Sequence, residues 1–168
     1  MNFKKPTQSE YISIKNLINV ADQKYKEFYS EEEFYNHKFW TENIDSLIAW
    51  ESKKEYICIY DDNDIMLWYS SYYLKNFQTL WISMIYTDTS SQNIWIWTQL
   101  IKYIENIAKS KNTLVVALET DKKAYWSVNF YKKNNYKILS DDDMTIYPYD
   151  QILTKKQIDW RYIFGKIL

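Results

Sequence analysis

Glycine is almost absent from this sequence: Gly165 is the only glycine among 168 residues. An average usage of about 7% would supply roughly 12. Tryptophan, which is normally rare, occurs eight times. Glycine supplies positive φ values and lets backbones approach a ligand closely, so its shortage bears on any loop that needs either property.

Cysteine and histidine are each present once, which limits redox and metal chemistry. One cysteine cannot form an intramolecular disulfide, and this favours a reducing compartment. Cys58 lies in the strand-like run 56–60, where a small buried hydrophobe is expected rather than a reactive thiol. His37 lies in the polar stretch 31–43 without a Cys/His cluster around it, so we expect a surface histidine and no metal site.

Long apolar runs are also missing: none approaches the ~18 residues of a membrane span, and residues 1–6 contain no apolar signal region. The net charge is −1 and the pI is about 5.9. Lys and Arg are spread along the chain, which argues against a nucleic-acid partner. We therefore expect one cytoplasmic domain over residues 1–168, with no nucleic acid and no membrane as partner.

The first third of the chain predicts helices. Ser9 is a candidate N-cap for a helix whose apolar residues run from Ile12 to Ala21. Ser30 and Glu33 resemble a capping box at the start of a second helical region that continues through Ile48.

The middle of the chain predicts three strands, at 55–60, 65–74 and 79–86. Turn-forming aspartates and asparagine occupy 61–64, and the short polar connections favour an antiparallel meander.

The rest of the sequence predicts helices and strands in alternation. A helix begins at residues 94–98 and stops near 109–112. The apolar run at 113–118 is typical of a strand buried on both faces. A helix over 122–133 and strands at 136–139 and 161–168 complete an α/β domain with a mixed sheet.

A strand, then a short polar loop, then a helix whose first turn begins at residues 94–98, form a potential anion site. Unpaired backbone N–H groups and the positive end of the helix dipole converge at a helix N-terminus. Every strand–helix unit has such an end, so this layout alone predicts an ordinary capped helix more often than a ligand site.

Two sequence blocks add specificity. From Ile85 the chain reads Ile-Tyr-Thr-Asp-Thr-Ser-Ser-Gln-Asn-Ile-Trp-Ile-Trp-Thr-Gln-Leu. Downstream it reads Leu118-x-Thr120, then Ala124-x-x-Ser127-x-x-Phe130-Tyr131-Lys132-Lys133-Asn134-Asn135-Tyr136. Over residues 55–139 this resembles the GNAT family of N-acetyltransferases, in which Gln/Arg-x-x-Gly-x-Gly/Ala opens the acetyl-CoA helix. The resemblance implies a mixed, mostly antiparallel sheet flanked by helices, with a strand–loop–helix acetyl-CoA site.

The resemblance also implies residue roles. Ile85, Tyr86 and Thr87 would pair with the pantetheine arm, and backbone N–H groups of residues 92–97 would hold the pyrophosphate. Tyr131 falls on the tyrosine that can protonate the departing thiolate; without the motif, a core aromatic would be favoured. The other implied acetyl-CoA residues are Gln92, Asn93, Ile94, Trp95, Ile96, Trp97, Thr98, Ser127 and Phe130.

Some positions depart from the family pattern. Ala124 replaces an asparagine, and Trp81 stands where many members carry a glutamate as general base. Glu119 on the neighbouring strand is the substitute candidate, although the amine can also lose its proton through ordered water. Asn135 replaces a turn glycine, a mild change because Asn tolerates the left-handed region.

The two loop glycines of the pattern are Trp95 and Trp97. Tryptophan also stands at other places where glycine would be ordinary, namely Trp50, Trp68, Trp126 and Trp160. A codon such as UGA is translated as Trp in some genetic codes and as Gly in others, so one hypothesis is that several of these are glycines in the natural protein. The alternative is a chain genuinely rich in tryptophan whose acetyl-CoA site has been lost or remodelled.

The predicted function is transfer of acetyl from acetyl-CoA to a primary amine by direct attack in a ternary complex. The acceptor could be a small amine, an aminoglycoside-like molecule or a protein amine, and the protein a monomer or homodimer. Asp141–Asp143 could attract a cationic amine, although a solvated acidic loop is the more ordinary interpretation. The alternative is a non-catalytic GNAT-fold binding or regulatory module that has lost coenzyme A binding.

Overall fold

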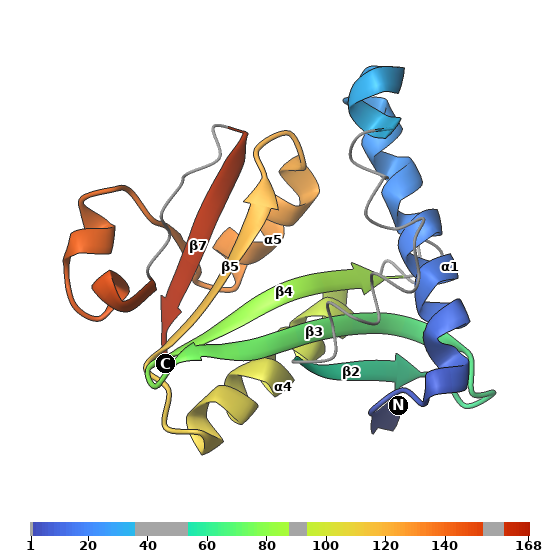
Figure 1. The fold of residues 1–168 in the computed structure, drawn as a ribbon, viewed down its shortest axis with the longest axis horizontal. Helices are drawn as coiled ribbons and strands as arrows, with labels where there is room; N and C mark the ends of the chain where they lie inside the picture. Colours follow the sequence, from blue (N-terminus) through green and yellow to red (C-terminus); the bar gives the residue numbers. More distant parts are fainter. Residues whose placement is uncertain (1, 36–53, 88–93, 153–159) are drawn as a thin grey trace. The chain divides into compact units, whose positions relative to one another are not determined.

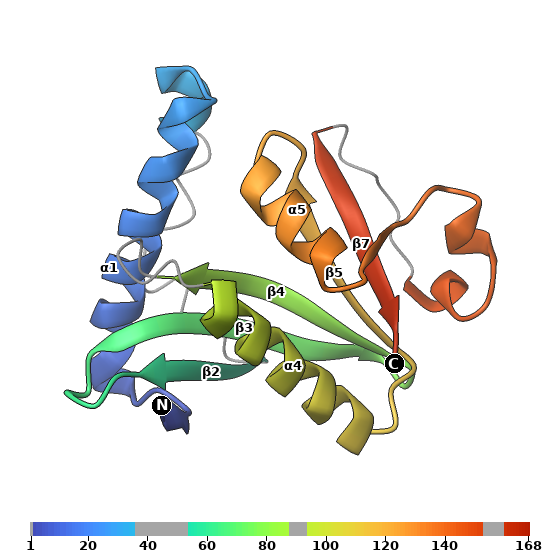
Figure 2. The same ribbon diagram turned by 180° about the vertical axis from the view of Figure 1, so that it is seen from behind.

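The computed structural model describes residues 2–35, 54–87, 94–152 and 160–168. Figures 1 and 2 trace the elements. The strands are β1 (Asn2–Lys4), β2 (Glu55–Tyr60), β3 (Met66–Asn76), β4 (Thr79–Thr87), β5 (Val115–Asp121), β6 (Lys137–Ile138) and β7 (Arg161–Ile167). The helices are α1 (Tyr11–Asp22), α4 (Ile94–Ser110) and α5 (Tyr125–Lys133), with 3₁₀ turns at Gln8–Glu10, Gln23–Glu27, Asp143–Thr145 and Tyr149–Ile152.

Within the described ranges, the strands form a seven-stranded sheet in the order β1-β2-β3-β4-β5-β7-β6. β4 and β5 pair in parallel, with Thr79 opposite Val115 and Ile82 opposite Leu118. The β1–β2, β2–β3, β5–β7 and β6–β7 pairs are antiparallel. The predicted mixed, mostly antiparallel sheet with flanking helices is therefore confirmed.

The chain divides into two compact units, one of residues 1–72 and 84–92, the other of residues 73–83 and 93–168. In the first unit, α1 buries its apolar face because its hydrophobic residues recur at helical spacing. Its core residues are Tyr11, Ile14, Leu17 and Ile18 from α1 with Cys58, Tyr60, Met66 and Tyr69 from β2 and β3.

The caps of the N-terminal helices differ from the prediction in one case. Ser9 is not the N-cap of α1, because it lies inside a 3₁₀ turn; the Glu10 carboxylate instead accepts hydrogen bonds from the Thr7 N–H at 2.6 Å and the Thr7 hydroxyl at 2.7 Å. The capping box at Ser30 is confirmed. The Ser30 N–H donates to Glu33 Oε2 at 2.9 Å, and the Glu33 N–H donates to Ser30 Oγ at 3.2 Å. The predicted continuation through Ile48 lies outside the described residues.

The second unit is built around β5, where residues 115–118 are all buried, as the sequence predicted. α5 lies beside β5 in both views (Figures 1 and 2). Gly165, opposite Ala117 in β7, is needed for close packing: a Cβ there would lie 2.8 Å from Leu139 Cδ1 and 2.9 Å from a ring carbon of Tyr149.

Asparagine and aspartate take the left-handed positions where glycine is usual. Among the described residues, positive φ values occur at Asp64 (58°), Asn112 (56°) and Asn135 (64°). Asn112 and Asn135 end α4 and α5 in the same way. The next residue in each case, Thr113 or Tyr136, donates its N–H to a carbonyl five residues back at 3.0 Å, which is the long bond of the Schellman motif. No described tryptophan needs a glycine-like φ.

Trp68 tests the glycine hypothesis at a site of full burial. Its side chain is 0% exposed in β3. If tryptophan is the natural residue, Trp68→Gly empties the volume of an indole and lowers the free energy of unfolding by about 3–5 kcal/mol. Trp160→Gly, at a 43% exposed tryptophan, is the matched control and should change it by about 1 kcal/mol or less. Denaturant unfolding measures both. A Trp68→Gly protein as stable as the parent would instead support glycine at position 68.

Cys58 gives a second test of the core. The thiol is completely buried, and burial raises its pKa to about 12. The thiolate is the reactive form, so we expect no labelling by an aromatic disulfide reagent in the native protein at mildly alkaline pH and complete labelling in guanidinium chloride. Rapid labelling of the native protein would contradict this burial.

Candidate functional site

The predicted acetyl-CoA helix begins where the sequence placed it. β4 ends at Thr87 and α4 begins at Ile94. The first turn of an α-helix leaves N–H groups without intrahelical partners, and the helix dipole makes that end attractive to anions. No acidic residue lies in the first turn of α4 to oppose an anion. Gln92, Asn93 and the side chains of Ile94 and Trp95 lie outside the described residues.

The other residues assigned to acetyl-CoA differ in burial. Ile85 and Tyr86 are half-buried and Thr87 is buried, while Ile96 is buried and Thr98 half-buried. Ile85–Thr87 belong to the first unit and α4 to the second.

Trp97 packs against α5. Its ring centroid lies 4.9 Å from that of Phe130, with the planes tilted by 60°. This is an ordinary aromatic contact distance, so the indole stabilises the α4–α5 contact. A glycine at 97 would remove that contact and also weaken the helix. Phe130, which the sequence assigned to acetyl-CoA, therefore also has a packing partner.

Among the predicted site residues whose side chains the structure describes, Tyr131 is the most enclosed, at 1% exposure. Its ring lies 5.2, 5.8 and 5.4 Å from the rings of Phe130, Tyr136 and Phe164. Burial raises the pKa of the phenol well above its usual value, and a hydrogen bond with the Ser127 side chain opposes this rise. The phenol therefore stays protonated throughout the physiological range.

Ser127 connects Tyr131 to the sheet. It lies four residues before Tyr131, so both side chains project from one face of α5. The Thr120 hydroxyl on β5 donates to Ser127 Oγ at 2.9 Å, and both residues are 8% exposed. Thr120 carried no role in the sequence analysis, because a threonine in a strand has no local signal for a contact with a later helix.

Glu119 lies on the opposite face of β5, since successive strand residues alternate between faces. Its Oε2 accepts a hydrogen bond from Arg161 Nη1 at 2.8 Å. Glu119 is thus held in an ion pair between β5 and β7 that no local sequence pattern indicates. The pairing joins residues 42 apart in sequence, and no motif links them.

Lys75 and Tyr73 lie within the electrostatic reach of Glu119. Burial lowers the pKa of the Lys75 ammonium, and the Glu119 carboxylate opposes that shift. Burial and then the charge of Glu119 raise the pKa of Tyr73. Lys75 Nζ lies 4.3 Å from the centroid of the Trp81 ring, a cation–π contact. Trp81, at the family's glutamate position, is therefore a buried packing residue that supports a lysine.

Two further predicted positions have structural roles. Ala124, where the family has asparagine, is the buried N-cap of α5 and makes no side-chain capping bond. Asp143 bonds to Lys137 Nζ at 2.6 Å and to the Ser140 N–H and hydroxyl, each at 3.0 Å. The Lys137 bond, followed by those from Ser140, lowers the pKa of Asp143 to about 2. Asp141 and Asp142 are exposed, which fits a solvated acidic turn.

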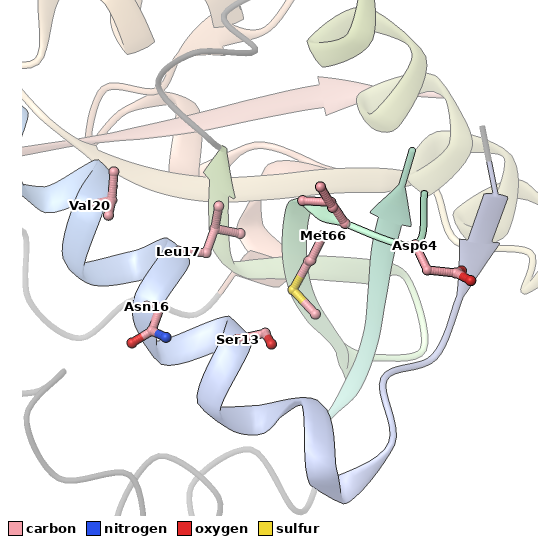
Figure 3. Close-up of a pocket in the computed structure, with 7 residues that line it drawn as sticks. Ser13, Asn16, Leu17, Val20, Asp64 and Met66 are labelled. Carbon is pink, nitrogen blue, oxygen red and sulfur yellow. The ribbon is translucent and has the colours of Figure 1, made fainter. Parts of the chain in front are cut away.

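The first unit contains a hollow of about 420 Å³ between α1 and the turn before β3. Figure 3 shows side chains of α1 on one side and those of the turn and of Met66 on the other. It is lined by Ser13, Asn16, Leu17, Val20, Asp64, Ile65 and Met66. Asp64 already pairs with Lys4 Nζ at 3.4 Å, and no predicted site residue lines the hollow.

Two absences hold for the described part of the chain. It contains no group of three or more His, Cys, Asp or Glu residues that could hold a metal ion. None of its helices combines the length and the apolar character that crossing a membrane requires.

Comparison with known families identifies the class of protein. The sequence model of the Acetyltransferase (GNAT) family matches residues 14–136, and the chain belongs to this family. GNAT acetyltransferases use acetyl-CoA as co-substrate and act on amine acceptors. No curated protein matches the sequence.

Solved structures share the fold at low identity. The PaiA N-acetyltransferase of Thermoplasma acidophilum, in complex with coenzyme A, has a TM-score of 0.74 and 14% identity, over 99% of this chain and 98% of that one. An aminoglycoside 6′-acetyltransferase type Ii has a TM-score of 0.67 and 14% identity, over 99% and 97%. A GNAT acetyltransferase of Elizabethkingia anophelis with acetyl-CoA bound has a TM-score of 0.65 and 17% identity, also over 99% and 97%.

The Glu119 cluster predicts a coupled titration. Glu119→Gln removes a negative charge that favours the charged form of Lys75, so the pKa of Lys75 should fall further below its usual value. NMR titration of ¹³C-labelled lysine side chains measures this. Asp143→Asn, which removes a half-buried carboxylate that pairs with Lys137 instead, is the control and should leave Lys75 unchanged. An unchanged Lys75 pKa in Glu119→Gln would contradict the coupling.

Proposed function

We propose that this protein is an N-acetyltransferase that moves acetyl from acetyl-CoA to a primary amine by direct attack in a ternary complex. The single observation that carries the proposal is Tyr131. It stands at the family's acid position on α5, as a protonated phenol enclosed by three rings. Family membership and the helix start at Ile94 support the same conclusion.

The proposed acetyl-CoA residues are those of the strand–loop–helix segment and of α5. Ile85, Tyr86 and Thr87 align the pantetheine arm, and the backbone N–H groups of residues 92–97 bind the pyrophosphate at the helix N-terminus. Thr98, Ser127 and Phe130 complete the proposed set. When bound, acetyl-CoA supplies a thioester carbonyl for attack by the amine.

The chain's own groups handle the protons. The amine nitrogen bonds to the carbonyl carbon, and its surplus proton passes to Glu119 or to water. When the C–S bond breaks, its electron pair remains on sulfur, and Tyr131 Oη gives the thiolate its proton. Tyr131 then regains a proton from solvent. Glu119 accepts a hydrogen bond from Arg161 Nη1 at 2.8 Å, which fixes its side chain beside β7 and supports this candidate.

A non-catalytic GNAT-fold module is the second candidate, and Trp97 is the observation that favours it. The indole at the family's second glycine position packs on Phe130, and both residues belong to the proposed acetyl-CoA set. A chain that keeps these rings in contact could retain the fold without binding coenzyme A. The codons of the gene distinguish the glycine hypothesis from genuine loss of the acetyl-CoA site. UGG codons at 95 and 97 would exclude glycine at these positions.

Coenzyme A binding tests the two candidates. Thermal unfolding is measured with and without coenzyme A for the parent protein and for Trp95→Gly/Trp97→Gly. A ligand that binds the folded protein raises the midpoint of thermal unfolding. At a ligand concentration a hundredfold above Kd, it adds about 2.7 kcal/mol to the free energy of unfolding. We expect a shift in the double-glycine protein. Trp126→Gly, on α5, is the control for the general effect of removing a tryptophan. No shift in either the parent or the double variant would support the module.

The acceptor is found by a screen. Each form that binds coenzyme A is incubated with acetyl-CoA and spermidine, kanamycin or a peptide with a free N-terminus and lysine, and the acetylated product is detected by mass spectrometry. The name of one structural neighbour, an aminoglycoside 6′-acetyltransferase, suggests kanamycin, and spermidine represents the small amines. We expect acetylation of at least one amine, and none with the N-blocked forms of the same probes. Localisation in the cytoplasm and a monomeric or homodimeric state stay predictions.

A further inference from the structure

We propose that Thr120 and Ser127 form an ordered hydrogen-bond chain that positions Tyr131 and stabilises its phenolate during acetyl transfer. The inference rests on the proposed function, since it assigns these residues a part in the proton step of Tyr131. Both are positioning residues, because they act through the phenol.

The direction of the chain follows from the donor inventory. The Thr120 hydroxyl donates to Ser127 Oγ at 2.9 Å. Ser127 has a single hydroxyl proton. With its oxygen accepting from Thr120, that proton is available for Tyr131 Oη, because Tyr131 lies one turn later on the same buried face of α5. A phenol that accepts from Ser127 keeps its own proton free to point elsewhere.

Burial strengthens the effect of this hydrogen-bond chain. Thr120 and Ser127 are 8% exposed and Tyr131 is 1% exposed, so water competes little for these hydroxyls. A phenolate formed beside the rings of Phe130, Tyr136 and Phe164 would lack solvation. The Ser127 hydroxyl is the nearby donor that compensates for that loss, and the Thr120 bond polarises the Ser127 hydroxyl in the same direction.

The backbone around Tyr131 is fixed as well. Its carbonyl accepts the N–H of Tyr136 at 3.0 Å in the turn that Asn135 closes. The backbone of Tyr131 is therefore fixed, and the Ser127 bond adds a constraint at the phenol oxygen in this proposal, since a general acid must be positioned before its acidity matters.

The proton balance is simple. As the C–S bond of the thioester breaks, sulfur takes the bonding electron pair and then the proton of Tyr131 Oη. The phenolate accepts a stronger hydrogen bond from Ser127, whose proton does not transfer. Solvent returns one proton to Tyr131 before the next turnover, and the amine's surplus proton leaves by the separate route through Glu119 or water.

Ser127 thus receives a different role from that of an acetyl-CoA ligand. A ligand role predicts that Ser127→Ala raises KM for acetyl-CoA. A role in the hydrogen-bond chain predicts that Ser127→Ala lowers kcat and changes KM for acetyl-CoA by less than about twofold.

The test is a double-mutant cycle on kcat with the best acceptor of the amine screen. We expect Tyr131→Phe to lower kcat by about a hundredfold or more. Ser127→Ala should lower it about tenfold and Thr120→Val about threefold, consistent with hydrogen bonds that strengthen as charge develops. In the Tyr131→Phe background, Ser127→Ala should cause no further fall beyond about twofold, because the chain acts only through the phenol.

Thr113→Val is the matched control for Thr120→Val. Thr113 is also buried and donates its hydroxyl at 2.9 Å, but to the carbonyl of Ala108. It should leave kcat unchanged. Thermal unfolding of every variant separates loss of fold from loss of rate.

The outcomes divide cleanly. If kcat falls as expected in Tyr131→Phe but is unaffected in Ser127→Ala, the hydrogen-bond chain is overturned and the acid assignment stays intact. An equal fall from Ser127→Ala with and without the phenol overturns it in the same way, since the serine would then act independently. An unchanged kcat in Tyr131→Phe overturns both the acid assignment and the chain, and a parent protein that acetylates no amine overturns the proposed function itself.

Discussion

The alternation of side chains along β5 is the constraint on which the second unit depends. Residues 115–118 are buried on both faces, and beyond them consecutive residues serve opposite faces. Thr120 bonds to Ser127 on α5, whereas Glu119 bonds to Arg161 and acts on the charge of Lys75. One strand thus separates the proposed acid from the proposed base.

Much of the fold could be predicted because its signals are local. Apolar periodicity placed the start of α4 at Ile94, and the continuous apolar run identified β5. The Ser30–Glu33 capping box was equally readable. The prediction that Ser9 is the N-cap was wrong. The N–H and hydroxyl of Thr7 instead donate to the Glu10 carboxylate in the 3₁₀ turn that precedes α1. Cap geometry depends on side-chain rotamers that residue type does not specify.

The candidate site was predictable only where a motif identified it. Tyr131, Phe130 and Ser127 stand in one block of sequence, and α5 brings them onto neighbouring positions. The partners of these residues were not predictable, because Arg161 reaches Glu119 through the pairing of β5 with β7, and Thr120 reaches Ser127 across a turn. Such contacts depend on register, and a one-residue shift would place each side chain on the other face.

The tryptophans remain central to whether the chain as written is active. Within the described residues, the left-handed positions belong to asparagine and aspartate, so those turns are formed without glycine. Trp68 and Trp97 have packing roles of their own. The case for glycine therefore rests mainly on position 95 in the first turn of α4, where an indole and a pyrophosphate would compete for space.

Initial-rate kinetics with acetyl-CoA and the amine both varied test the central claim most directly. Direct transfer in a ternary complex predicts an acetylated amine and double-reciprocal lines that intersect. Parallel lines, which indicate an acetyl-enzyme intermediate, or the absence of any acetylated amine would contradict the account.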